Sequence, residues 1–450
     1  MRPTLISVVL ATVAFALPVI AQTTQPTDKD PAMAAPTGNE GKSWWQWDKM
    51  TGDWGGARTA LAEKGITFDM DVTQIIQDNA HGGASTKNGF RYSGSSDMYL
   101  RLDTGKMGLW KGGHITLHAE PKWGNGVNAK AGSLMPVNFD AYLPTADECV
   151  MALSEWYYTQ VLLEGKLILV AGKLWGAMAF DKNEFANSEQ TQFMNLGLRV
   201  NPLVGAFLPY TDLGAAAIVN PTDWLSILTA VADSEGKATT TGFNTTFHGP
   251  THTSVIHEWN VKIKPFDKPG TQRVGFVWSS MEYKNLQPVS PFKETGPLMM
   301  KLLGPKTFQK VGSMLPFNYA PDNVMIYYNF DQYVITKADD PTQGIGLFGR
   351  YGWARSDVNA ITNYYSFGVG GKGMVPERPK DQYGVGFYLL DMSNYMPSNY
   401  TQETGVEMYY SFEIAPWLHV SPDFQIVCNP GSGGYHDTAL VWGIRFQMTL

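Results

Sequence analysis

The sequence has 450 residues and a formal net charge of −7 at pH 7, with 17% charged and 13% aromatic residues and only two cysteines. The acidic excess argues against nucleic acid as a partner and against a strongly anion-selective pore. After the N-terminal segment, no apolar run of about 18 residues occurs, so no transmembrane helix is expected. A secreted chain that lacks a transmembrane helix is either soluble or a β-barrel.

The N-terminal residues have the features of a secretory signal peptide, because Arg2 precedes an apolar stretch and a small-residue cleavage site. We expect the signal peptide to cover residues 1–21. Residues 22–43 are rich in Thr, Pro, Ala and Asp and are predicted to form a disordered linker. Residues 44–65 are predicted to be a Trp-rich segment followed by a short helix. Its indoles suit either a barrel mouth or membrane interface, or a small local cluster.

Residues 66–450 show strand periodicity, which is clearest near the C-terminus. There Trp442, Ile444 and Phe446 alternate with Gly443 and Arg445. The polar faces of such segments carry Arg, Glu and Asp near mid-strand, as expected for a wet lumen and a lipid-facing exterior. We predict an all-β fold, a sixteen-stranded antiparallel transmembrane barrel. Its strands are expected to begin near Ile66, Ser96, Gly112, Leu153, Lys166, Gly214, Trp224, Val255, Thr271, Asp322, Gln343, Thr362, Asp381, Glu403, Trp417 and Asp437.

The predicted connections alternate between short and long, which is the pattern of outer-membrane barrels. Short turns, such as residues 164–165 and 415–416, are expected at the periplasmic end. Long connections, such as residues 123–152 and 174–213, are expected outside. One further strand candidate, residues 193–200, breaks the alternation, so we expect it to lie inside a loop.

The long connection at residues 174–213 is the best candidate for a constriction, because it mixes aromatic rings with charged and amide groups. Sugars bind through aromatic faces and through hydrogen bonds to planar polar groups. The candidate residues in this loop are Trp175, Phe180, Asp181, Asn183, Phe185 and Arg199. The candidate pore residues within strands are Arg101, Glu155, Arg350, Glu407, Asp423 and Arg445. These strand residues either contact the solute or only brace one another.

Catalytic and metal-binding motifs are not evident in the sequence. His114 and His118 share one face of a predicted strand with Glu120, and we interpret them as polar groups of the pore wall rather than as metal ligands. We therefore expect no catalytic residues, no metal and no cofactor. Cys149 and Cys428 are both predicted to lie on the extracellular side, which makes them a candidate disulfide.

Several motifs, in the same order along the chain, resemble those of the OprB-type carbohydrate-selective porins. The entry segment contains Gly-Asp-Trp-Gly-Gly-x-Arg at residues 52–58. Arg-Val-Gly-Phe follows at residues 273–276, and Gly-Leu-Phe-Gly-Arg at residues 346–350. Ser-Pro-Asp-Phe-Gln-Ile with Asn-Pro-Gly occupies residues 421–431. The chain departs from the family at Ser421, where Gln is frequent, and at Leu450, where Phe is usual.

The resemblance implies an outer-membrane porin that lets small sugars diffuse passively through a lumen narrowed by the third outer loop. It implies small carbohydrates, outer-membrane lipid, lipopolysaccharide and the barrel-assembly machinery as partners, with a monomer or a homo-oligomer both open. A general or ion-selective porin is the first alternative. A barrel hydrolase on the cell surface and a soluble secreted sugar-binding protein are the others.

Overall fold

The structure, a computed structural model, describes residues 41–450 except 147, 177–178, 247–250, 288–295 and 305–317. The expected signal peptide, and all but the last residues of the expected linker, lie outside the described residues. Within the described part of the chain, no helix is both long enough and apolar enough to cross a membrane.

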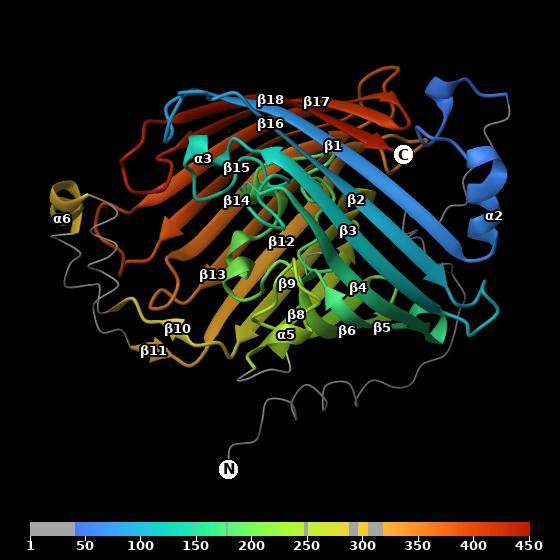
Figure 1. Ribbon diagram of the computed structural model, residues 1–450, viewed down its shortest axis with the longest axis horizontal. Coiled ribbons are helices and arrows are strands. Elements are labelled where there is room, and N and C mark those ends of the chain that lie inside the picture. Colours follow the sequence, from blue (N-terminus) through green and yellow to red (C-terminus); the bar gives the residue numbers. More distant parts are fainter. Residues whose placement is uncertain (1–40, 147, 177–178, 247–250, 288–295, 305–317) are drawn as a thin grey trace, which may run out of the picture. The chain divides into compact units, whose positions relative to one another are not determined.

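Sixteen antiparallel strands close into one barrel, in which each strand pairs with its neighbours in sequence and β1 pairs with β18 (Figure 1). A separate two-stranded sheet, β10 with β11, belongs to the connection between β9 and β12. The strands are β1 (Ile66–His81), β2 (Arg91–Asp103), β3 (Gly113–Asn125), β4 (Val150–Leu162), β5 (Leu167–Leu174), β6 (Asp212–Thr222), β7 (Leu225–Asp233), β8 (Thr253–Ile263), β9 (Gly270–Ser279), β10 (Tyr283–Lys284), β11 (Tyr319–Ala320), β12 (Asn323–Thr336), β13 (Gly344–Ala354), β14 (Ile361–Lys372), β15 (Gln382–Met392), β16 (Gln402–Ala415), β17 (Leu418–Cys428) and β18 (Ala439–Thr449).

The described helices are short and lie in the N-terminal segment or in connections. They are η2 (Trp44–Gln46), η3 (Trp54–Gly56), α2 (Ala57–Glu63), α3 (Asn128–Ala131), η4 (Leu163–Gly165), α4 (Leu196–Arg199), η6 (Pro202–Ala206), α5 (Phe243–Thr246), η7 (Pro265–Asp267) and α6 (Gly296–Leu303). The predicted sixteen-stranded barrel is confirmed, and every barrel strand begins within a few residues of its predicted start. Residues 193–200 contain α4 and no strand, as expected for part of a loop.

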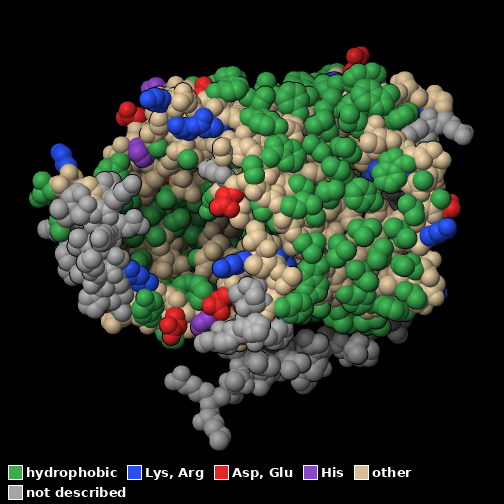
Figure 2. Space-filling model, in the orientation of Figure 1, with side chains coloured by type: hydrophobic (Ala, Val, Ile, Leu, Met, Phe, Trp, Pro, Cys, Tyr) green, Lys and Arg blue, Asp and Glu red, His purple; other side chains and the backbone are tan. Residues whose placement is uncertain are grey.

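The two faces of the sheet differ as the period-two pattern predicts. In β18, the side chains of Trp442 and Ile444 are exposed, whereas Val441 before them and Arg445 after them are buried. The exposed apolar residues form the outer face of the barrel, and Figure 2 shows hydrophobic side chains gathered over it. The same view shows a hollow, with charged side chains around its rim.

The N-terminal segment packs beside the seam at which the first and last strands meet. The backbone N–H of Met50 donates to the carbonyl oxygen of Thr449 at 2.8 Å. The rings of Trp44 and Trp45 lie 4.3 and 5.7 Å from that of Trp417, in the turn between β16 and β17. The indoles of Trp44 and Trp45 therefore pack against one of the short turns at this end of the barrel.

Candidate functional site

The connection between β5 and β6, residues 175–211, is called the third loop below, and it packs against the inner face of the barrel. Its buried apolar side chains form one cluster with lumen-facing aromatic residues of β12–β16. The loop contributes Phe180, Phe185, Phe193, Leu198, Leu203 and Phe207, and the strands contribute Tyr327, Tyr333, Phe348, Tyr364, Tyr388 and Tyr409. This cluster gives the barrel an apolar core on one side of its lumen.

Glycines on the inner faces of β13–β15 make room for the loop. A Cβ atom added at Gly370 would lie 2.5 Å from Cβ of Phe185, and one added at Gly346 would overlap the ring of Phe185. At Gly384, the added atom would lie 2.8 Å from the ring of Phe193. These distances are shorter than van der Waals contact, so larger residues here would force the loop away from the wall.

Arg350 holds the third loop to β13 through a set of hydrogen bonds. Its guanidinium donates to the Asp181 carboxylate, with Nε 3.0 Å from Oδ2. It also donates to the carbonyl oxygens of Leu198 and Ala186, each at 2.7 Å. The Arg350 side chain is 0% exposed. The Asp181 carboxylate in turn accepts from the Asn329 side-chain amide of β12 at 2.6 Å, so this loop segment is bound to two strands.

A second group of anchors lies on β16–β18. The Glu407 carboxylate accepts from the backbone N–H groups of Met194 and Asn195 at 2.6 and 2.9 Å. The Arg445 guanidinium donates to the carbonyl oxygens of Glu189 and Gln192 at 2.6 and 2.9 Å. These bonds pair charged wall residues with backbone groups that would otherwise be unsatisfied.

The predicted site residues therefore divide into two sets. Arg350 and Arg445 were expected either to contact the solute or to brace other residues, and the third loop covers both guanidiniums. Alternation predicts which face of the sheet a residue lies on, but it does not predict what covers that residue. The predicted residues that are buried are Glu155, Phe180, Asp181, Asn183, Phe185, Arg199, Arg350, Glu407, Asp423 and Arg445. Arg101 and Trp175 remain partly exposed.

The wall formed by β1–β3 carries partly exposed charges. Arg101 donates to the Asp69 carboxylate at 2.8 Å, its side chain is 21% exposed, and its guanidinium lies 4.3 Å from the ring centre of Tyr99. Lys49 also pairs with Asp69. The ring of Tyr99 stacks on that of His118 at 4.1 Å. This wall thus offers cationic, anionic and aromatic groups side by side.

The third loop reaches this wall through its polar edge. The Gln190 side-chain amide donates to Asp97 Oδ2 at 2.6 Å. Arg199 pairs with Glu189, and its guanidinium lies 4.4 Å from the ring centre of Trp175. The residues that the sequence interpretation missed are Asp69, Asp97 and Glu189. Asp97 could have been found, since it lies four residues before Arg101 in β2 and so shares its face of the strand.

One cluster of side chains could hold a metal ion. Candidate ligand atoms of Asp97, His118 and Glu120 lie within 4.8 Å of one another. The two ring nitrogens of His118 are 3.0 Å from Asp97 Oδ1 and 2.9 Å from Glu155 Oε2. An imidazole between two carboxylates is a stable ion-pair arrangement in its protonated form. His114 does not belong to this cluster. The sequence analysis had placed it on one strand face with His118 and Glu120, and the third member of the cluster is instead Asp97 of the neighbouring strand.

Asp140, in the connection between β3 and β4, supplies a titratable group beside the channel. Burial raises the pKa of the Asp140 carboxyl to about 7. A hydrogen bond of 2.6 Å from the Ser95 hydroxyl acts in the opposite direction, while the charges of Asp97 and Glu189 raise the pKa further. The carboxyl therefore changes its charge near neutral pH.

The candidate disulfide does not form in this structure. Cys149 and Cys428 are both free and exposed.

A closed sixteen-stranded barrel with an apolar exterior and a polar, partly filled lumen is the structure of an outer-membrane porin. Residues 87–450 match the model of the family described as carbohydrate-selective porin, OprB family. The chain belongs to this family. It is an outer-membrane porin for sugars, and its fold and family are those of a channel rather than an enzyme.

Known relatives agree with this assignment. Porin B of Pseudomonas aeruginosa is 24% identical over 436 residues, covering 88% of this chain and 90% of that protein. The putative porin QuiX of Acinetobacter baylyi is 22% identical, covering 90% of this chain and 93% of that protein. The high-pH structure of Pseudomonas putida OprB has the same fold, with a TM-score of 0.76 and 21% identity over 90% of this chain and 99% of that chain.

Proposed function

We propose that sugars pass between the third loop and the wall of β1–β3, and that both surfaces contact them. The loop would contribute Trp175 and Glu189, and the wall Asp69, Asp97 and Arg101. The observation that carries this proposal is their partial exposure, in contrast to the buried anchors on the opposite wall. The lumen on that opposite side is filled by the third loop, which narrows the path.

The chemistry of these groups suits a neutral polyol. An indole face packs against sugar C–H groups, while carboxylates accept hydrogen bonds from hydroxyls and a guanidinium donates to them. Opposite charges are paired on both surfaces, as in Arg101 with Asp69 and Arg199 with Glu189. The path therefore offers little net attraction to either kind of ion. Arg199 is buried and acts as a positioning residue for Trp175 and Glu189.

The proposal is tested by sugar uptake into liposomes together with single-channel conductance. Trp175→Ala and Arg101→Gln are expected to slow sugar entry at low concentration, where binding matters, and to leave or raise the conductance of small ions. Trp442→Ala is the matched control, because this indole is exposed on the outer face. It removes an equally large side chain without altering the path.

The outcome that would contradict the proposal is a parallel change in sugar flux and ion conductance. If sugar flux and ion conductance fall or rise together in Trp175→Ala and Arg101→Gln, the residues set only the width of the path. The protein would then behave as a general diffusion porin at this position, despite its family. Swelling rates that depend on sugar size alone would support the same conclusion.

We further infer that the barrel-assembly machinery inserts this protein, which then functions as a monomer or as a homo-oligomer. Support comes from the closed transmembrane sheet, which cannot insert strand by strand without exposing unpaired backbone groups to lipid. Depletion of the machinery should reduce the amount of folded protein in the outer membrane. Native mass spectrometry in mild detergent distinguishes the monomer from a trimer.

A further inference from the structure

Asp97, His118 and Glu120 form a compact group of potential metal ligands on the inner face of β2 and β3. One candidate ligand atom of each residue lies within 4.8 Å of the other two. His118 and Glu120 are two residues apart in β3 and therefore share a face of the strand. Met98 pairs with Ala119, so their neighbours Asp97 and Glu120 lie side by side across the two strands. The register of the sheet thus brings one imidazole and two carboxylates together.

His118 and Asp97 are each oriented by a hydrogen bond from outside the group. Nδ1 of His118 lies 2.9 Å from Glu155 Oε2, so that Nε2 faces Asp97 Oδ1 at 3.0 Å. Glu155 is itself fixed, because its Oε1 accepts from the backbone N–H of Trp175 at 3.0 Å. The Gln190 side-chain amide donates to Asp97 Oδ2 and leaves Oδ1 for the group. Histidines that bind metals commonly give their second ring N–H to a carboxylate in this way, which fixes the ring and increases its basicity.

The Glu120 carboxylate is held at one oxygen and free at the other. The Tyr210 hydroxyl donates to Oε1 at 2.9 Å. Glu120 is only 9% exposed, and within the described residues its Oε2 has no hydrogen-bond partner. The hydroxyl of Ser154, which lies near this carboxylate, also lacks a partner there. A buried carboxylate oxygen without a partner is unfavourable, and a bound cation would supply the missing interaction.

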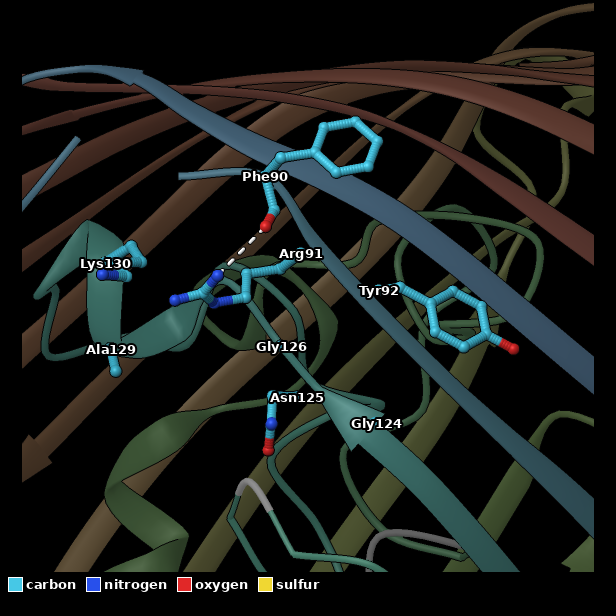
Figure 3. A pocket seen from close by; sticks show the side chains of 8 residues that line it. All are labelled: Phe90, Arg91, Tyr92, Gly124, Asn125, Gly126, Ala129 and Lys130. Atoms are coloured by element: carbon cyan, nitrogen blue, oxygen red, sulfur yellow. Dashed lines mark hydrogen bonds between the residues drawn. The ribbon is translucent and has the colours of Figure 1, made fainter. Parts of the chain in front are cut away.

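The pocket at the outer end of β2 and β3 is a different feature of the same wall (Figure 3). The charged residues among those that line it are Arg91 and Lys130, and Figure 3 shows both side chains on one side of the pocket. Two cationic groups would repel a metal ion. The features that favour a cation are therefore confined to the group around His118.

We propose that Asp97, His118 and Glu120 bind Zn²⁺ in the wall of the lumen. Zn²⁺ accepts nitrogen and carboxylate ligands, and three protein ligands leave its fourth position to water or a solute. Ca²⁺ and Mg²⁺ require more oxygen ligands than this group offers. The Asp97 side chain is 16% exposed and that of His118 is 4% exposed, so the fourth position would open toward the lumen beside Asp97.

The ion would replace the proton that the hydrogen bond between His118 Nε2 and Asp97 Oδ1 requires. Glu155 and Tyr210 would be positioning residues, because each orients a ligand without binding the metal. The proposal departs from the expectation, drawn from the sequence, that His118 and Glu120 are only polar groups of the pore wall.

The test is calorimetric titration of the tag-free, full-length porin in detergent with Zn²⁺, after treatment with EDTA. The unmodified protein should bind a single equivalent. Glu120→Gln loses a ligand and should bind at least about 100-fold more weakly, whereas Tyr210→Phe keeps all three ligands and should bind roughly 10-fold more weakly. Circular dichroism checks that both variants form the barrel. No sugar is used, so the result is independent of the proposed sugar path.

Glu413→Gln is the matched control. The Glu413 carboxylate also lies beside a histidine, with Oε2 3.7 Å from His419 Nε2, but within the described residues no third potential ligand joins this pair. The control should bind Zn²⁺ like the unmodified protein. Equal affinities of Glu120→Gln and Glu413→Gln, or no binding by the unmodified protein, would overturn the proposal. Displacement of Zn²⁺ by Mg²⁺ at equal concentration would also overturn it, because the carboxylates would then bind cations without help from the imidazole.

Discussion

Replacing Arg350 with Met should release the third loop from the barrel wall while leaving the barrel itself intact. The substitution keeps much of the side-chain volume but removes every donor. The Asp181 carboxylate loses its buried ion-pair partner, and the carbonyl oxygens of Leu198, Ala186 and Arg199 lose their hydrogen bonds. The strands keep their own backbone ladders, since Arg350 contributes only its side chain to these contacts.

The expected magnitude follows from the burial of this group. Removing one partner of a fully buried ion pair costs about 3–5 kcal/mol, because the other charge stays buried and uncompensated. Each 1.4 kcal/mol is a factor of ten in an equilibrium constant. Local opening of the third loop should therefore become about 10²- to 4 × 10³-fold more frequent. Because the undocked loop no longer fills one side of the lumen, ion conductance should rise and selectivity for sugars should fall.

Hydrogen exchange measures this opening directly. The backbone N–H groups of Met194 and Asn195, which donate to Glu407, should lose protection in Arg350→Met, whereas amides in β1 and β18 should not. Arg378→Met is the control, since this arginine lies in a short turn and its side chain is 37% exposed. Unchanged exchange in the third loop, together with unchanged conductance, would refute the reasoning and would show that the apolar cluster alone holds the loop.

Three further results are expected. Gly370→Leu should displace the third loop and raise ion conductance, whereas Gly205→Leu, with open space around its Cβ position, should not; equal conductance of the two would contradict the close packing. Burial raises the pKa of Asp140 from 3.8 to about 7. The folded state therefore favours the neutral carboxyl, so the free energy of unfolding should be highest at acid pH and should fall as pH rises toward 7. Unfolding measured between pH 4 and 8 should show this fall, and Asp140→Asn should remove it. Cys149 and Cys428 should both react with a maleimide without reductant, and labelling only after reduction would indicate a bridge.

The strands and their orientation could be predicted because alternation is a local property of the chain. Arg445 points inward because Ile444 and Phe446 suit lipid, and no knowledge of distant residues is needed. The cover over Arg445 could not be predicted in this way, because it comes from loop residues some 250 positions away that bind through their backbone. Sequence periodicity contains no information about which loop fills the lumen.

A weaker signal for that packing was present in the glycines. Gly368 and Gly370 of β14 lie opposite Gly386 and Gly384 of β15, so two neighbouring strands lack side chains at the same place on one face. Glycine within a strand often marks the close approach of another part of the chain. The pattern could have identified the docking surface, although not the phenylalanines that occupy it.

The glycine-lined inner faces of β13–β15 also limit which substitutions this porin can accept. Where β13–β15 have no side chains, the phenyl rings of the third loop act as the missing interior of the sheet, so the loop is a structural layer as well as a selectivity element. The two edges of the loop differ in how well they can accept substitutions. Phe185 and Phe193 fit a surface that accepts no larger neighbour, whereas Trp175, Glu189 and Gln190 face the open side. An engineer who wishes to alter the transported solute can vary the second edge, while exchange of the whole loop would remove part of the barrel's core.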